Sequence, residues 1–182
     1  MFVALLDACV LVPVVLRDTL LYSADAGLYL PRWSERILAE VGRSLVVDRN
    51  LRESHATDRV GAIGRSFPEA MVQGFEPLID SMTNDVSDRH VLAAAVHAGA
   101  PMIVTDNTKD FPTHALAPLR ITALSSNEFL TLLFDTDPGL MRALLVTQAA
   151  GYHSPPLTFA RLLAALELHA PTFVARFVEE DL

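Results

Sequence analysis

The sequence predicts an α/β protein in which a small parallel sheet is flanked by helices and followed by an all-helical extension. Over residues 1–124, short apolar segments that suit buried strands alternate with helical segments, the pattern of a parallel sheet covered on both faces. Strand patterns are missing from residues 125–182. The length of 182 residues and the 51% of hydrophobic residues fit one packed domain with a smaller appendage.

The N-terminal third supplies one strand and two helices. The segment "MFVALLD" predicts a short buried strand that ends at Asp7. Pro13 can occupy the first turn of a helix, which we expect to extend to about Gly27. Residues 31–50 predict an amphipathic helix, because four apolar residues share one face: Ile37, Leu38, Val41 and Leu45.

The middle of the chain is predicted to be mainly helical. A helix is expected over residues 54–65, and Pro68 interrupts it or starts the next one. The segment "FEPLID", residues 75–80, is expected to be a short strand or an extended connector. Residues 87–100 predict another helix, with Ser87 as its N-cap.

Two further strands and a helical tail complete the prediction. The apolar segments at residues 101–105 and 119–124 predict the second and third clear strands. Four segments of residues 125–182 are expected to be helical: "SSNEFLTLLF", "DPGLMRALLVTQAAG", "TFARLLAALELHA" and "PTFVARFVEEDL". Pro138 and Pro171 suit the first turns of two of these helices.

Composition excludes several classes of protein. The longest apolar run is shorter than the roughly 20 residues that a membrane helix needs. The N-terminus lacks a basic start and carries Asp7 within its apolar run, so it does not resemble a signal peptide. A single cysteine, Cys9, excludes an internal disulfide framework and a cysteine zinc cluster. We therefore expect a soluble, cytoplasmic protein.

The net charge of −8 argues against a broad basic surface for nucleic acid. Residues 1–66 hold eight acidic residues and eight arginines, whereas residues 67–182 hold fourteen acidic residues and six basic ones. Seven of the arginines lie between Arg32 and Arg65. This stretch is either a solvated pair of helices or a local phosphate-binding region, for which the planar guanidinium group is well suited.

Three aspartates follow predicted strands. Asp7 ends the first strand, and Asp106 and Asp110 follow the strand at residues 101–105. Sites in parallel α/β sheets form at the carboxyl ends of strands, where the strand order reverses. Taken alone, an aspartate at a strand end is more often a turn former than a metal ligand, because Asp hydrogen-bonds its own backbone in turns.

Asp88 begins the helix predicted at residues 87–100, on the face that must pack against the sheet. His90 and His97 lie on the opposite face, where we expect them to be in solvent. An acidic residue in the first turn also interacts favourably with the helix dipole, which is the alternative explanation. An aspartate that only stabilises the helix end would gain little by pointing towards the core.

Glu40 lies at the edge of the apolar face of its helix, where its side chain can reach into a cleft. The alternative is a surface ion pair with Arg36 or Arg43, which lie one turn away on the same helix. Both arginines point away from the apolar face at angles near that of Glu40. They are therefore candidates to bind phosphate beside it.

Four carboxylates at one edge of a sheet would repel one another unless a cation joined them. The four candidates are Asp7, Glu40, Asp88 and Asp110. Oxygen ligands without a cysteine or histidine cluster suit Mg²⁺ or Mn²⁺ rather than zinc. Such a site can activate water and stabilise the leaving oxygen in phosphodiester hydrolysis.

The segments "LLDACVLVP", "PRWSERILAE" and "SDRHVLAAAVHAGAPMIVTDNTKDFP" resemble the successive motifs of PIN-domain ribonucleases, and most closely those of VapC toxins of bacterial toxin–antitoxin pairs. The resemblance covers residues 1–124. It implies a PIN-like nuclease domain there, a helical C-terminal extension over residues 125–182, and a metal-dependent endoribonuclease that acts as the toxin of a type II pair. The implied partners are RNA, a cognate antitoxin and a second copy of the chain in a homodimer, with no membrane.

The resemblance also implies roles for individual residues. The catalytic acids are Asp7, Glu40, Asp88 and Asp110, and the metal ligands are Asp7, Asp88 and Asp110. Glu40 and Asp106 are further candidate ligands, and Thr105 and Asn107 match positions that support the site. The first motif often carries Asn two residues after its Asp, where this chain has Cys9, which puts a hydrogen bond to the site in question.

Three other functions are weaker alternatives. The first is a catalytically silent PIN-like scaffold that binds RNA or protein, although intact acids at four positions argue against it. A phosphatase of the haloacid dehalogenase type needs a second Asp two residues after its nucleophile, where Cys9 stands. A serine or cysteine hydrolase is poorly supported, because the sequence has no nucleophile elbow.

Overall fold

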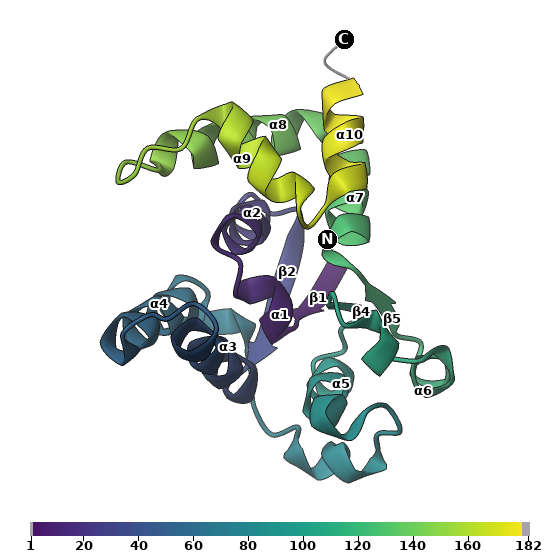
Figure 1. Cartoon of the computed structure of the whole chain (residues 1–182). Coiled ribbons are helices and arrows are strands. Elements are labelled where there is room, and N and C mark those ends of the chain that lie inside the picture. The colour runs from purple at the N-terminus through teal and green to yellow at the C-terminus, as the bar shows by residue number, and fades with distance from the viewer. Residues whose placement is uncertain (1, 180–182) are drawn as a thin grey trace.

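The computed structural model describes residues 2–179, which contain a five-stranded parallel sheet in the order β3-β2-β1-β4-β5 (Figure 1). The strands are β1 Phe2–Leu6, β2 Tyr29–Ser34, β3 Met71–Val72, β4 Met102–Val104 and β5 Thr122–Leu124. The central strand β1 pairs with β2 on one side and with β4 on the other, all parallel. The order of the strands thus reverses between β1 and β4, where α/β sheets bind ligands. The predicted α/β class is confirmed.

Helices cover the sheet and continue beyond it. Those of the first part of the chain are α1 Ala8–Leu11, α2 Val14–Asp25, α3 Glu35–Val47, α4 Glu53–Ser66, α5 Arg89–His97 and α6 Thr113–Leu116. The extension contributes α7 Ser126–Thr136, α8 Pro138–Gly151, α9 Phe159–Glu167 and α10 Pro171–Glu179. Figure 1 shows α7 to α10 gathered beside α2, whereas α5 lies across the sheet from them.

The described helices include none that is both long and apolar enough to cross a membrane. The last predicted helix includes residues 180–182, and the first predicted strand includes residue 1; these residues lie outside the described part of the chain. Short 3₁₀ segments fill the remaining connections: Pro68–Ala70, Glu76–Ser81, Val86–Asp88, Thr108–Asp110 and Ala117–Leu119.

The prediction of a helix from residue 31 was wrong for its first four residues. Residues Tyr29–Ser34 form β2, in which Tyr29, Pro31 and Trp33 are buried on alternate positions. The helix α3 begins only at Glu35, because the hydroxyl of Ser34 caps it by accepting the amide N–H of Ile37 at 3.2 Å. Pairing with β1 decides the conformation of this segment, and the local pattern does not reveal that pairing.

Two expectations for the middle of the chain were also wrong. The segment predicted as a strand or extended connector is the 3₁₀ helix Glu76–Ser81. Ser87 does not cap α5; it lies in the 3₁₀ turn Val86–Asp88, which Asp85 caps by accepting the amide N–H of Ser87 at 2.9 Å. Helix α5 therefore starts at Arg89, with Asp88 at its N-cap position and no hydrogen bond from that side chain to the helix.

The extension shares the hydrophobic core of the sheet. Phe129 of α7 is fully buried, and its ring packs edge-on against the ring of Tyr29 in β2, with 4.9 Å between the centroids. The ring of Phe2 in β1 also packs edge-on against the ring of Phe129, with 6.1 Å between the centroids. The buried residues of the sheet and of the extension form one continuous cluster. The domain boundary at residue 124 remains a prediction.

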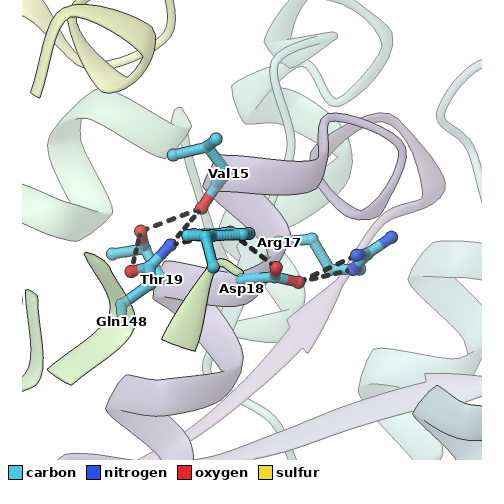
Figure 2. Close-up of polar contacts among 6 residues, drawn as sticks. Val15, Arg17, Asp18, Thr19 and Gln148 are labelled. Carbon is cyan, nitrogen blue, oxygen red and sulfur yellow. Dashed lines mark hydrogen bonds and ion pairs between the residues drawn. The ribbon is translucent and has the colours of Figure 1, made fainter. Parts of the chain in front are cut away.

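A buried polar network also joins α2 to the extension (Figure 2). The hydroxyl of Thr19 donates to Oε1 of Gln148 at 2.8 Å, and the amide group of Gln148 donates to a backbone carbonyl of α2 at 3.1 Å. The hydroxyl of Tyr152 donates to Oδ2 of Asp18 at 2.7 Å, and Arg17 binds the other oxygen of that carboxylate at 2.8 Å. Hydrogen bonds of this kind fix one arrangement of the two helices, because a buried polar group without a partner is costly.

We expect Phe129→Ala to lower the free energy of unfolding by about 3–5 kcal/mol, because the change leaves a cavity between α7 and the sheet. Leu132→Ala on the exposed side of the same helix is the matched control and should cost less than about 1 kcal/mol. Fluorescence of Trp33, the single tryptophan, follows unfolding of the sheet in urea. An unchanged midpoint at Trp33 in the Phe129→Ala protein would mean that the extension unfolds separately.

Candidate active site

Asp7 occupies the carboxyl end of the central strand, next to the point where the strand order reverses. Its side chain is buried, with 3% of the residue exposed. The amide N–H of Ala8 donates to Oδ1 at 2.7 Å, so Asp7 caps α1. The hydroxyl of Thr105, which follows β4, donates to Oδ2 at 2.7 Å. The carboxylate is therefore held in one orientation by groups from two neighbouring strand ends.

Cys9 completes the support of this carboxylate. Its thiol donates to Oδ2 of Asp7 at 3.3 Å and lies 3.4 Å from the hydroxyl of Thr105. Burial and the charge of Asp7 raise the pKa of the thiol to about 12, so it keeps the proton that it donates. The thiol thus hydrogen-bonds Asp7 from the position where the first motif often carries Asn.

The loop after β4 brings the other supporting positions to the same place. The amide N–H of Asn107 donates to the hydroxyl of Thr105 at 3.1 Å, which leaves that hydroxyl free to donate to Asp7. Asp110, in the 3₁₀ turn Thr108–Asp110, accepts the amide N–H of Asp85 at its backbone carbonyl at 3.2 Å. This bond ties the loop to the segment that leads to Asp88.

Asp88 is the predicted site residue whose negative charge acts on Asp7. Burial raises the pKa of Asp7, the hydrogen bonds from Thr105, Cys9 and Ala8 partly offset this, and the negative charge of Asp88 raises it further. Asp88 is half-buried at the start of α5, and its carboxylate accepts the hydroxyl of Ser87 at 2.7 Å. A cation at this edge would relieve both the burial of the Asp7 carboxylate and its repulsion by the charge of Asp88.

Glu40 contacts His90, which follows Asp88 by two residues in α5. Nε2 of His90 is 3.1 Å from Oε1 of Glu40, an ion pair if the imidazole is protonated, although the angle is not that of a hydrogen bond. Arg36 and Arg43 lie 3.5 and 3.6 Å from the same oxygen. Burial raises the pKa of Glu40, but His90 and the two arginines outweigh it, and the net pKa is lowered.

The expectation that His90 is in solvent was wrong. His90 is 1% exposed, whereas His97 is exposed as predicted. Helix α5 packs against three strands and against the 3₁₀ helix Glu76–Ser81, and Glu40 of α3 contacts His90, so the helix is buried over most of its circumference. A helical wheel shows which residues share a face but does not show which second layer will cover the other face.

Asp106 is turned towards the extension. Its Oδ1 accepts the amide N–H of Ser126, the first residue of α7, at 2.9 Å. Its own amide N–H donates to the thiol of Cys9 at 3.3 Å. Sequence reasoning did not identify this bond, because nothing in the local pattern relates position 106 to position 126.

The donor set fits a hard divalent cation bound by few protein ligands. Within residues 2–179, no three acidic, histidine or cysteine side chains are grouped closely enough to surround one ion. Mg²⁺ keeps several waters and commonly binds one or two carboxylates together with substrate phosphates. Asp7 and Asp88 match that requirement, and zinc would need a larger set of nitrogen or sulfur ligands. The assignment of individual metal ligands remains a prediction.

Two family profiles match the chain. The profile described as PIN domain matches residues 3–109, and the profile described as VapC50 C-terminal domain matches residues 127–179. A curated protein of Mycobacterium tuberculosis (strain ATCC 25618 / H37Rv), named "Putative ribonuclease VapC50", is 41% identical over 107 residues. The aligned part is 59% of this chain and 63% of that relative. No solved structure is a significant match.

Asp7→Asn should stabilise the metal-free protein, and by an amount that grows with pH. The pKa of Asp7 is raised above its ordinary 3.8 in the folded state. Above that pH the unfolded chain loses the proton before the folded one, so the wild type loses stability as pH rises, whereas the variant has no charge to bury. Thermal melting in EDTA from about pH 4 to about pH 7 measures the difference.

The exposed Asp80→Asn is the matched control, and its melting temperature should follow that of the wild type at every pH. At neutral pH, Mg²⁺ should raise the melting temperature of the wild type and leave that of Asp7→Asn unchanged. A difference between wild type and Asp7→Asn that is constant with pH would contradict this electrostatic account of the site.

Proposed function

The chain belongs to the PIN-domain family, and from this membership we propose that it is a metal-dependent endoribonuclease that hydrolyses phosphodiester bonds of RNA. The observation that carries the proposal is the buried carboxylate of Asp7, which Thr105 and Cys9 orient at the edge where the strand order reverses and on which the negative charge of Asp88 acts. The ribonuclease name of the relative from Mycobacterium tuberculosis supports the same activity.

The proposed roles follow from the contacts around Asp7. Asp7 and Asp88 would hold Mg²⁺ or Mn²⁺, and Glu40 is assigned as an acid at the border of the site. Asp110 is assigned as a third ligand, which would have to approach the cation on binding, because no three acidic side chains of the described residues are grouped around one point. When bound, the cation supplies the charge that activates water and neutralises the phosphate in an in-line displacement. Thr105 and Cys9 fix the orientation of the Asp7 carboxylate by their hydrogen bonds.

The proposal extends to a biological role and to partners. The relative carries the name VapC50, and a C-terminal profile of the same name matches residues 127–179. We therefore place the chain as the cytoplasmic toxin of a type II toxin–antitoxin pair, with a cognate antitoxin as partner and a homodimer as its assembly. Residues 1–124 would form the nuclease domain and residues 125–182 the helical extension.

A catalytically silent scaffold that binds RNA or protein is the alternative. The observation in its favour is that Glu40 is already paired with His90, Arg36 and Arg43. A metal-dependent cleavage assay separates the two functions, because a scaffold binds RNA without cutting it.

We expect cleavage of RNA that requires Mg²⁺ or Mn²⁺ and leaves 5′-phosphate and 3′-hydroxyl ends, as attack by water on phosphorus does. Asp88→Asn should abolish cleavage while leaving the protein folded, and the exposed Asp80→Asn, which removes the same charge elsewhere, should retain it. The ends are identified by their ligation and phosphatase sensitivity. Full activity in EDTA, or products with 2′,3′-cyclic phosphate, would refute the proposed mechanism.

RNA binding by so acidic a protein should depend on few arginines. Arg36 and Arg43 have side chains 52% and 65% exposed and border Glu40. In the Asp7→Asn background, which blocks cleavage, Arg36→Ala/Arg43→Ala should weaken RNA binding. It should also flatten the salt dependence by about 1–1.5 units, since each neutralised phosphate on a single strand contributes roughly 0.7.

The matched control is Arg59→Ala/Arg65→Ala, which removes two exposed arginines from α4. RNA affinity is measured over a salt series for all three proteins, and the control should behave as the parent does. A steep slope that neither pair of changes alters would show that RNA is held on a different surface.

A further inference from the structure

A short chain of hydrogen bonds connects the C-terminal extension to the Asp7 carboxylate. The amide N–H of Ser126 donates to Asp106 at 2.9 Å, and the amide N–H of Asp106 donates to the thiol of Cys9 at 3.3 Å. That thiol and the hydroxyl of Thr105 both donate to Oδ2 of Asp7. Asp106 thus contacts both the extension and the thiol that supports Asp7.

The end of α7 that holds Asp106 is itself fixed by the rest of the extension. The hydroxyl of the buried Ser126 donates to the carbonyl of His169, in the connection between α9 and α10, at 3.1 Å. The side chain of Asn127 accepts the amide N–H of Thr172 at 2.8 Å and donates to its hydroxyl at 3.0 Å. The start of α7 therefore cannot shift without breaking contacts to α10.

Helix α7 does not need Asp106 as its cap. Ser125 and Glu128 form a complete capping box, in which the hydroxyl of Ser125 accepts the amide N–H of Glu128 at 3.2 Å. The carboxylate of Glu128 in turn accepts the amide N–H of Ser125 at 2.8 Å. The box binds the amide N–H groups of Ser125 and Glu128, whereas Asp106 binds that of Ser126. The contact from Asp106 therefore adds one further bond to the helix end and at the same time ties the loop that contains Asp106 to α7.

We propose that Asp106 is a positioning residue through which the C-terminal helices hold the loop after β4 in the place where Thr105 and Cys9 orient Asp7. This inference rests on the proposed ribonuclease function only for its consequence on catalysis. The contact itself links the extension to the site whatever that site does. Asp106 then acts through its acceptor oxygen, and its negative charge is not required.

Two substitutions of Asp106 distinguish the role of its acceptor oxygen from that of its negative charge. Asp106→Asn keeps an oxygen that can accept the amide N–H of Ser126, and Asp106→Ala removes it. The matched control is Asp137→Ala, because Asp137 caps α8 by accepting the amide N–H of Leu140, also at 2.9 Å, and lies in the extension away from the loop. Both alanine variants should lower the melting temperature by similar amounts.

Alkylation of Cys9 by iodoacetamide reads out the loop without any assay of activity, because Cys9 is the only cysteine of the chain. The rate should rise about fivefold in Asp106→Ala, the factor that corresponds to losing one such cap, as the loop opens more often. Asp106→Asn and Asp137→Ala should react as the wild type does. In RNA cleavage, Asp106→Ala should lose about tenfold or more in kcat with little change in KM, and Asp106→Asn should lose clearly less than Asp106→Ala.

Two results would overturn the proposal. If Asp106→Asn and Asp106→Ala both lose cleavage while Cys9 stays protected in both, Asp106 acts by its charge, as a metal ligand would. If Asp106→Ala matches Asp137→Ala in alkylation and in kcat, the contact only stabilises the fold. If the wild type cuts no RNA, the proposed function fails, and the alkylation rates alone still decide whether Asp106 holds the loop.

Discussion

Asp7 places a carboxylate in the interior of the protein, at the end of the central strand and beside a second acid, Asp88. Burying such a group is unfavourable unless hydrogen bonds or an opposite charge compensate. The structure supplies three donors, from Ala8, Thr105 and Cys9, but the pKa of Asp7 remains raised. The hydrogen bonds hold the group without neutralising it, so the remaining cost is the one that a divalent cation would remove. On this account, the site is preorganised for an ion and is less stable without it.

The helical extension contributes to this preorganisation. Its helices share one core with the sheet through Phe129, and buried hydrogen bonds from Gln148 fix it against α2. The hydrogen bond from Ser126 to Asp106 then attaches the loop after β4 to this fixed extension. A catalytic group must be held close to its working geometry by its surroundings, and loops alone hold groups less well than helices and strands do. In this protein, four helices beyond the parallel sheet provide part of that support.

The sequence was most informative where one local pattern sufficed. Apolar runs predicted β1, β4 and β5, because these short strands are buried and their residues are therefore mostly apolar. The end of the first run made Asp7 a candidate site residue. The sequence-based predictions were wrong where the conformation or burial of a segment depends on residues distant in the chain. Strand β2 exists because β1 pairs with it, and His90 is buried because α5 packs against the sheet and the 3₁₀ helix Glu76–Ser81, with Glu40 in contact with the imidazole. The bond from Asp106 to α7 joins positions twenty residues apart across a strand, so only the folded chain reveals it.

The account's central claim is that Asp7 and Asp88 share one divalent cation. Anomalous scattering from a crystal of the protein soaked in Mn²⁺ tests this claim directly, since it locates the ion without any assumption about catalysis. The account predicts a single strong anomalous peak within coordination distance of both carboxylates, and its loss in a crystal of Asp7→Asn. A peak bound elsewhere, or a peak at this edge that persists in Asp7→Asn, would contradict it.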